Sequence, residues 1–128
     1  MGKRTTKQRE AIRKVFVNEG RPLSPSEVHE IVQREVSSLG IATVYRAVKD
    51  LVGEEWLVPI SIAGTTRYER ADLGHHHHFH CHSCDKTYDI KGCVGDLSQM
   101  VPEAFRILSH ELTIMGMCQD CNTGAISS

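Results

Sequence analysis

Residues 75–84 read HHHHFHCHSC, a run of metal-binding side chains in the middle of the chain. It holds six of the eight histidines and two of the five cysteines of a 128-residue protein. Folding alone does not require such a density of nitrogen and sulfur donors. A purification tag would lie at a terminus, whereas this run lies beside a Cys-x-x-Cys pair. The run therefore predicts metal binding.

The chain contains two Cys-x-x-Cys pairs, Cys81/Cys84 and Cys118/Cys121, with 33 residues between them. Four thiolates complete a tetrahedral Zn²⁺ shell without an open position, which is the composition of a structural site. Two redox dithiols or a pair of disulfides are the alternatives, but neither pair has the helical context of a thioredoxin-like motif. The spacing favours structural zinc, with Cys93 outside it as a small buried hydrophobe.

The histidines cannot all bind that zinc ion, because four thiolates already fill its shell. Side chains of an extended strand alternate between two faces. His75 and His77 would then point one way, and His76, His78 and His80 the other, which predicts two further sites. Their remaining ligands must come from elsewhere, and the candidates are Glu69, Asp89, Asp96 and His110. Mixed imidazole and carboxylate sets suit Fe²⁺, Mn²⁺, Zn²⁺ or Ni²⁺.

Length and charge bound the class of protein. A chain of 128 residues with 40% apolar content forms one ordinary domain or two small ones. No apolar run reaches the ~20 residues of a membrane span, and no signal peptide begins the chain, so a cytoplasmic protein is expected. Residues 1–53 carry ten Lys and Arg against six Asp and Glu, whereas residues 54–128 carry five against ten. The basic N-terminal half suggests a polyanionic partner.

The N-terminal half predicts three helices and a hairpin. Thr5 or Thr6 can cap a first helix that ends at Gly20, and residues 24–27 (SPSE) form a capping box for a second. A third helix is expected over residues 42–52, followed by strands over 56–60 and 66–69. This is the pattern of a winged helix-turn-helix. The polar face of the third helix would meet DNA bases, and it carries Thr43, Tyr45, Arg46 and Lys49. The alternative is a solvated face on an ordinary helical bundle.

Beyond residue 79 the pattern predicts strands over 87–90 and 110–116 and a short helix over 96–101. A strand–helix–strand module of about 50 residues buries little apolar surface, so it needs a metal and a dimer partner. The expected fold is α+β, with a winged helix-turn-helix domain followed by a small α/β dimerisation domain. The boundaries are 1–70 for the DNA-binding domain, 71–74 for a hinge and 75–128 for the dimerisation domain.

The motifs together resemble the ferric uptake regulator family of metal-dependent bacterial repressors along essentially the whole chain. The matching stretches are residues 6–9 (TKQR), 41–46 (IATVYR), 75–78 (HHHH), and the two Cys-x-x-Cys pairs. The resemblance implies a homodimer that binds a double-stranded DNA operator when a regulatory metal is bound. It also implies structural zinc held by the four cysteines.

Carried over residue by residue, the resemblance implies two further metal sites and a set of DNA contacts. The regulatory site corresponds to Glu69, His76, His78 and Asp89. The second site corresponds to His75, His77, Asp96 and His110. Tyr45 and Arg46 correspond to base contacts in the major groove, and Arg4 to a minor-groove contact.

The sequence departs from the family pattern at two places. Iron and peroxide sensors usually carry a histidine before the second helix, where this chain has Pro22 after Arg21. Zinc regulators often carry a cysteine before the histidine run, where this chain has Arg70 and Ala71. The expected regulatory ion is therefore Fe²⁺ or Zn²⁺, with Mn²⁺ or Ni²⁺ and a peroxide-sensing role left open.

Two other classes of protein compete with a repressor. A metal-dependent hydrolase would use the histidines around an open coordination position, but the chain shows no paired base and nucleophile. A metal storage protein would have no use for Tyr45 and Arg46. The sequence therefore favours a DNA-binding regulator over an enzyme.

Overall fold

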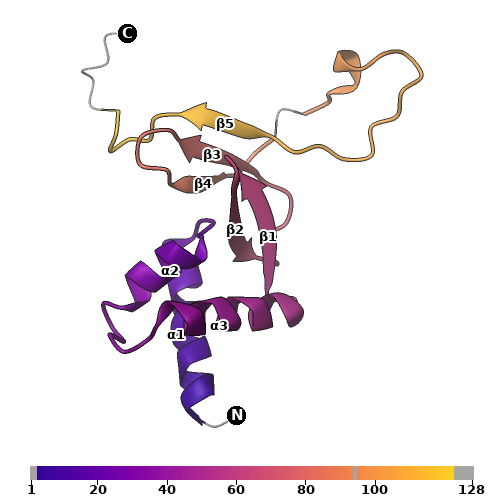
Figure 1. The fold of residues 1–128 in the computed structure, drawn as a ribbon. Coiled ribbons are helices and arrows are strands. Elements are labelled where there is room, and N and C mark those ends of the chain that lie inside the picture. The colour runs from indigo at the N-terminus through magenta and orange to yellow at the C-terminus, as the bar shows by residue number, and fades with distance from the viewer. Residues whose placement is uncertain (1–2, 94, 123–128) are drawn as a thin grey trace.

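The computed structural model describes the backbone of residues 3–93 and 95–122, and side chains from residue 7 onward within those ranges. The described residues form an N-terminal group of three helices and a hairpin, and a C-terminal three-stranded sheet (Figure 1). The elements in chain order are α1 Lys3–Glu19, α2 Pro25–Val32, α3 Ile41–Gly53, β1 Leu57–Ile62, β2 Thr65–Arg70, β3 His77–Cys81, β4 Thr87–Ile90, the 3₁₀ helix η1 Ser98–Met100 and β5 Thr113–Gly116. Within these ranges, no helix is long and apolar enough to cross a membrane.

The three helices enclose the main apolar core. Ile12 and Phe16 of α1 are buried against Val28 of α2 and Leu51 of α3. The predicted capping box is confirmed, because the Ser24 side chain accepts the Glu27 backbone N–H at 3.2 Å and Glu27 accepts that of Ser24 at 2.9 Å. These reciprocal bonds satisfy two amides that the helix itself leaves unpaired. The core fixes α3 with its polar face turned to solvent.

The hairpin of β1 and β2 follows α3 directly. Its two strands are antiparallel, and the turn between them uses Ala63 and Gly64, which both have positive φ. Such a turn matches the right-handed twist of the strands it joins. Tyr68 of β2 also pairs with Leu23 through two backbone hydrogen bonds of 2.8 and 2.9 Å. This pairing attaches the hairpin to the segment that connects α1 and α2.

The second sheet has the strand order β4-β3-β5, with β3 antiparallel to β4 and parallel to β5. Its register places His78 opposite Asp89 and His77 opposite Ile90. Cross-strand partners share a face of the sheet. The strand at 87–90 is where the sequence predicts it, whereas β5 begins at Thr113 rather than at residue 110.

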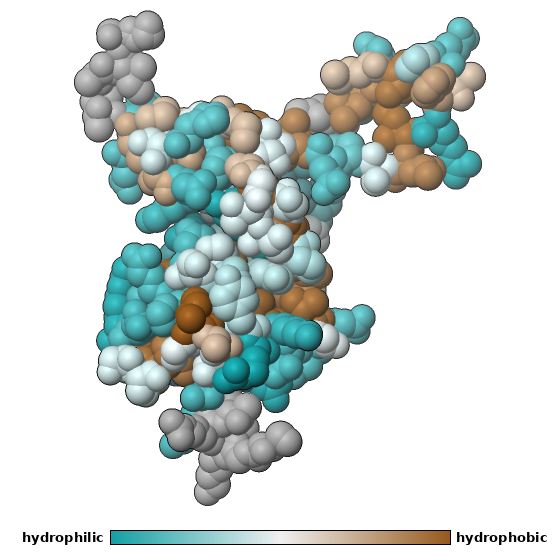
Figure 2. Space-filling model, in the orientation of Figure 1, coloured by the Kyte–Doolittle hydropathy of each residue, from teal (hydrophilic) through white to brown (hydrophobic). Residues whose placement is uncertain are grey.

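The helix predicted over residues 96–101 is wrong in extent, because only the single turn of η1 forms there. None of its residues is buried, so the turn has no packed face that would extend it into an α-helix. Met100, Phe105 and Leu108 of this region are 79%, 68% and 81% exposed. Figure 1 shows the segment leading away from the sheet, and Figure 2 shows hydrophobic residues gathered on it.

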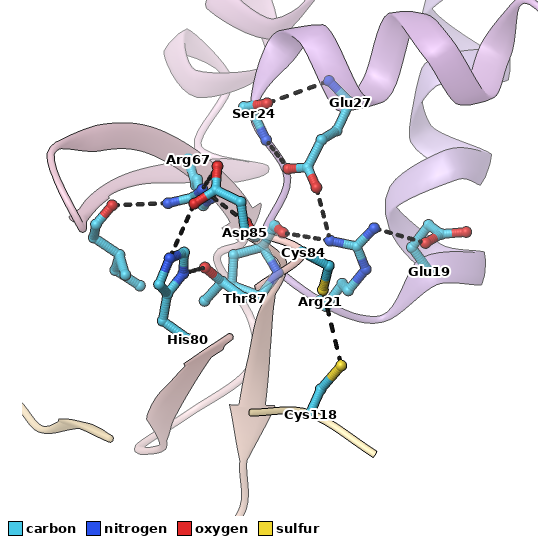
Figure 3. Close-up of polar contacts among 12 residues, drawn as sticks. Glu19, Arg21, Ser24, Glu27, Arg67, His80, Cys84, Asp85, Thr87 and Cys118 are labelled. Carbon is cyan, nitrogen blue, oxygen red and sulfur yellow. Dashed lines mark hydrogen bonds and ion pairs between the residues drawn. The ribbon is translucent and has the colours of Figure 1, made fainter. Parts of the chain in front are cut away.

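A buried arginine joins the hairpin to the second sheet. Arg67 of β2 is 1% exposed and donates to the Ile62 carbonyl at 2.7 Å and to the Asp85 carbonyl at 3.0 Å. Its guanidinium also lies 3.1 Å from the Asp85 carboxylate, which in turn contacts His80 at 3.0 Å (Figure 3). Asp85 directly follows Cys84, so this network ties the hairpin to the turn that carries two of the cysteines.

Candidate metal centres

The first candidate centre lies where the hairpin meets the second sheet. Glu69 comes from β2, His76 directly precedes β3, His78 lies on β3 and Asp89 on β4. The His76 and His78 Nε2 atoms each lie 3.0 Å from a different oxygen of Glu69, and each lies 3.5 Å from Asp89 Oδ1. Four ligand atoms from both parts of the chain therefore face one point.

Hydrogen bonding at His76 shows that this point suits a cation. His76 Nδ1 lies 2.7 Å from the Gly74 carbonyl, which can only accept, so Nδ1 carries the proton. In neutral His76 the Nε2 lone pair then faces a carboxylate oxygen of Glu69 at 3.0 Å. Two acceptors at this distance require a proton or a metal ion between them. The Gly74 carbonyl also fixes the orientation of the His76 ring, as hydrogen-bond partners of metal-binding histidines commonly do.

The carboxylates of this cluster have shifted proton affinities. Burial raises the pKa of Asp89 to about 6, and the neighbouring Glu69 acts in the same direction. Burial also raises the pKa of Glu69, but hydrogen bonds to His78 and His76 outweigh it and leave that pKa lowered. Asp89 Oδ1 is buried without a hydrogen-bond partner. A divalent cation would satisfy this atom, so the donor set fits a metal ion.

The second candidate centre comprises the four cysteines of the two Cys-x-x-Cys pairs. Their sulfur atoms lie within 4.8 Å of one another, and Cys84 Sγ is 3.8 Å from Cys118 Sγ. The Cys84 and Cys118 backbone amides donate to Cys81 Sγ at 3.5 and 3.4 Å. These amides lower the pKa of Cys81 to about 6, which favours the thiolate that zinc requires. The geometry and donors fit Zn²⁺.

The third candidate centre joins three histidines to a cysteine. His75, His77 and His110 lie with Cys93, and all four ligand atoms are within 4.8 Å of one another. Burial, followed by the neighbouring His75 and His110, lowers the pKa of His77. Its imidazole is therefore held in the neutral form that can bind a metal.

Two predictions fail at this third centre. Asp96 is not a member of the cluster, because its carboxylate instead accepts the Ser98 backbone N–H at 2.9 Å. Cys93 is exposed rather than a buried hydrophobe, and its Sγ lies 3.4 Å from His77 Nε2 and 3.2 Å from His110 Nε2. The sequence offered a thiol three residues before Asp96, but it did not show which side chain the loop turns towards the sheet.

Arg21 and His80 have partners outside the metal centres. Arg21 lines a small hollow beside Glu69 and Asp89, but its guanidinium pairs with Glu27 at 3.1 Å and Glu19 at 3.3 Å (Figure 3). His80 is buried on Thr87 and Asp85 instead of joining His76 and His78. Arg21 therefore stabilises the start of α2 and supplies no metal ligand.

The polar face of α3 lies on the surface. Tyr45 is 54% exposed, Arg46 and Lys49 are exposed, and Arg46 donates to the Thr43 hydroxyl at 3.2 Å. Tyr45, Arg46 and Lys49 also line a shallow apolar hollow between α3 and the hairpin. Arg4 lies in α1, but its side chain is outside the described residues. Arg46 is thus presented to solvent and held by a neighbour on the same helix.

Comparison with known proteins gives the family. Residues 1–115 match the Ferric uptake regulator family. The chain is 32% identical over 127 residues to the ferric uptake regulation protein of Campylobacter jejuni, covering 94% of this chain and 81% of that relative. It is 27% identical over 128 residues to the zinc uptake regulation protein of Mycobacterium tuberculosis, covering 95% and 97% of the two chains.

A solved structure agrees with this assignment. The ferric uptake regulator Fur of Helicobacter pylori, a protein with three functional metal binding sites, superposes with a TM-score of 0.67. It is 26% identical and covers 90% of this chain and 79% of that one. The chain belongs to the ferric uptake regulator family, whose members are metal-responsive transcriptional regulators and not enzymes.

Proposed function

We propose that this chain is a repressor whose operator affinity is set by a metal ion bound to Glu69, His76, His78 and Asp89. The observation that carries the proposal is the origin of these ligands. Glu69 belongs to the hairpin that packs on the helices, and the other three belong to the second sheet and the residues before it. One ion would therefore fix the angle between two parts of the chain.

The boundaries of those parts follow the elements. Residues 1–70 are the winged-helix DNA-binding domain, residues 71–74 the hinge, and residues 75–128 the dimerisation domain. The order of three helices and a hairpin supports the first, and the sheet with its cysteine centre supports the last. The exposed apolar side chains of residues 100–117 support a homodimer. Met100, Phe105 and Leu108 are exposed to water in the single chain, and burying them against a second copy would be favourable.

The third helix is the element that reads DNA. Its exposed side chains would enter the major groove, where arginine can make two hydrogen bonds to guanine and tyrosine can contact a thymine methyl group. These residues are Thr43, Tyr45, Arg46 and Lys49, and Arg4 would reach the minor groove. A dimer would place its two copies of α3 on half-sites about one helical turn apart.

The metals are assigned by donor type. Zn²⁺ occupies the four-cysteine centre as a structural ion. The regulatory centre offers imidazole and carboxylate ligands, which suit Fe²⁺ or Zn²⁺ and also accept Mn²⁺ or Ni²⁺. A second histidine site uses His75, His77 and His110. As a DNA-bound regulator of metal homeostasis genes, the protein would act in the bacterial cytoplasm.

The regulatory ion would act by differential affinity. The ion binds tightly to the conformation in which Glu69 lies beside His76 and His78. It binds more weakly to conformations in which the hairpin has moved away from these histidines. The first conformation is the one in which the two copies of α3 match the operator. Coupling of this kind is worth about 5- to 150-fold in affinity.

A gel shift at buffered free metal tests the proposal. The wild type is expected to bind its operator more tightly with metal, and His76→Ala/His78→Ala is expected to lose this dependence. His29→Ala/His82→Ala is the matched control, because both of its histidines lie outside the three centres. Unchanged metal dependence in the first double variant would rule out the assigned regulatory site.

A further inference from the structure

We infer that Cys93 completes the second histidine site as a thiolate ligand, forming a three-imidazole, one-sulfur zinc site that clasps residues 91–112 onto the sheet. The inference deepens the proposed function, because it concerns the second metal site of the proposed regulator. Its tests do not use DNA binding, so it can fail while the proposed repressor function stands.

The distances are those of a tetrahedral shell before an ion arrives. Zn–N bonds of about 2.0–2.1 Å and a Zn–S bond of about 2.3 Å put neighbouring ligand atoms about 3.3–3.6 Å apart. Cys93 Sγ lies 3.2 Å from His110 Nε2 and 3.4 Å from His77 Nε2, and these two nitrogens are 3.3 Å apart. His75 packs edge-on against both rings, with centroids 4.7 and 5.1 Å away.

The backbone turns Cys93 towards the sheet and Asp96 away from it. Gly92 and Gly95 have φ of 121° and 91°, conformations that other residues rarely adopt. The chain can therefore reverse soon after β4 ends at Ile90, which brings Cys93 onto His77. Asp96 uses its carboxylate on the Ser98 amide and does not compete for the ion.

A thiolate changes which ion this site selects. The regulatory centre combines two imidazoles with two carboxylates, which accept Fe²⁺ and Mn²⁺ as well as Zn²⁺. The second site combines three imidazoles with one sulfur, a softer set that favours Zn²⁺. The two histidine-containing sites therefore differ in metal preference although their histidines alternate along one strand.

The ion would also close a loop. Cys93 and His110 stand 17 positions apart near the two ends of the segment between β4 and β5, while His77 lies on β3. A metal that joins all three clips both ends of that segment to the sheet, as a cross-link would. The clipped segment carries Met100, Phe105 and Leu108, the exposed apolar side chains of the proposed dimer surface. Zinc at this site would thus hold that surface in place.

Cobalt spectroscopy tests the sulfur ligand. Protein holding one Zn²⁺ in the four-cysteine centre is titrated with Co²⁺, and a near-ultraviolet sulfur-to-cobalt charge-transfer band is expected. Cys93→Ser should lose this band and bind a second Zn²⁺ at least about tenfold more weakly. Asp96→Asn and His76→Ala/His78→Ala should keep the band. A band that survives in Cys93→Ser, or a wild type without one, would overturn the inference. Retention of the first Zn²⁺ in every variant shows that each one is folded.

Limited digestion with chymotrypsin tests the clasp. Phe105 and Leu108 are exposed cleavage positions within the clipped segment. A second equivalent of Zn²⁺ should slow cleavage there roughly tenfold in the wild type and in Asp96→Asn, but not in Cys93→Ser. Equal protection of Cys93→Ser would show that the thiol does not hold the segment. Loss of protection in Asp96→Asn would assign the fourth ligand to the carboxylate.

Discussion

Replacing Arg67 by alanine is expected to lower the free energy of unfolding by about 3–5 kcal/mol, the range for emptying a site filled by a long buried side chain. Arg67 is 1% exposed, so its whole apolar stem is lost from a packed position. The Ile62 carbonyl also loses a donor 2.7 Å away. An unpaired buried acceptor of this kind costs about 1–3 kcal/mol.

Two companion variants divide that loss into its parts. Arg67→Met keeps most of the stem and loses the hydrogen bonds and the screened ion pair with Asp85, so it should cost about 1–3 kcal/mol. Asp85→Ala keeps Arg67 and removes its ion pair together with the contact between Asp85 and His80. The Asp85 side chain is 71% exposed and solvent screens the pair, so this variant should cost less than about 1 kcal/mol. The expected order of destabilisation is Arg67→Ala, then Arg67→Met, then Asp85→Ala.

Urea unfolding with Zn²⁺ held constant provides the measurement, with the slope of each transition compared to confirm that the variants unfold alike. If Asp85→Ala were as destabilising as Arg67→Ala, the ion pair rather than packing would dominate the contact. A cost for Arg67→Ala below about 1 kcal/mol would show that the contact between hairpin and sheet contributes little.

Metal affinity at the regulatory centre should fall as the pH drops from neutrality through about 6, because two of its ligands must lose a proton to bind the ion. Burial lowers the pKa of His76, but its hydrogen bonds to the Gly74 carbonyl and to Glu69 outweigh burial and leave that pKa raised. Burial raises the pKa of Asp89 to about 6. Each proton that the ion displaces makes the metal affinity change about tenfold per pH unit. Isothermal titration of Asp89→Asn should therefore show a metal affinity that depends less steeply on pH. Cys118→Ser should expose residues 81–87 to amide hydrogen exchange, since the proposed structural zinc would organise the turn that carries them. Arg46→Ala should lose about 1–3 kcal/mol of operator discrimination, whereas Lys49→Ala should weaken all DNA sequences alike in fluorescence anisotropy.

The sequence predicts those features of the fold that depend on interactions between residues close together in the chain. The capping box at Ser24 and Glu27 places the start of α2, because both hydrogen bonds lie within four residues. The alternation of the histidine run also holds, since His76 and His78 lie with Glu69 and Asp89, and His75 and His77 lie with His110. A side-chain period of two needs only an extended backbone. The metal-binding roles of these groups stay predictions.

The sequence is less informative where long-range packing decides. Nothing in residues 91–96 indicates that two positive-φ glycines turn Cys93 to the histidines and leave Asp96 as a cap for Ser98. The helix expected over 96–101 shortens to one turn because it finds no surface to pack on. In the sequence, Arg67 does not differ from the other polar residues of its strand. Only its place two positions before Glu69, on the same strand face, signals that it is buried.

The coupling between the regulatory metal and the operator is tested most directly by measuring metal affinity with and without operator DNA. Linkage requires that the operator tighten metal binding by the same factor by which metal tightens operator binding. The expected factor is about 5 to 150 for the wild type and near one for His76→Ala/His78→Ala. A metal affinity that the operator leaves unchanged in the wild type would contradict this coupling.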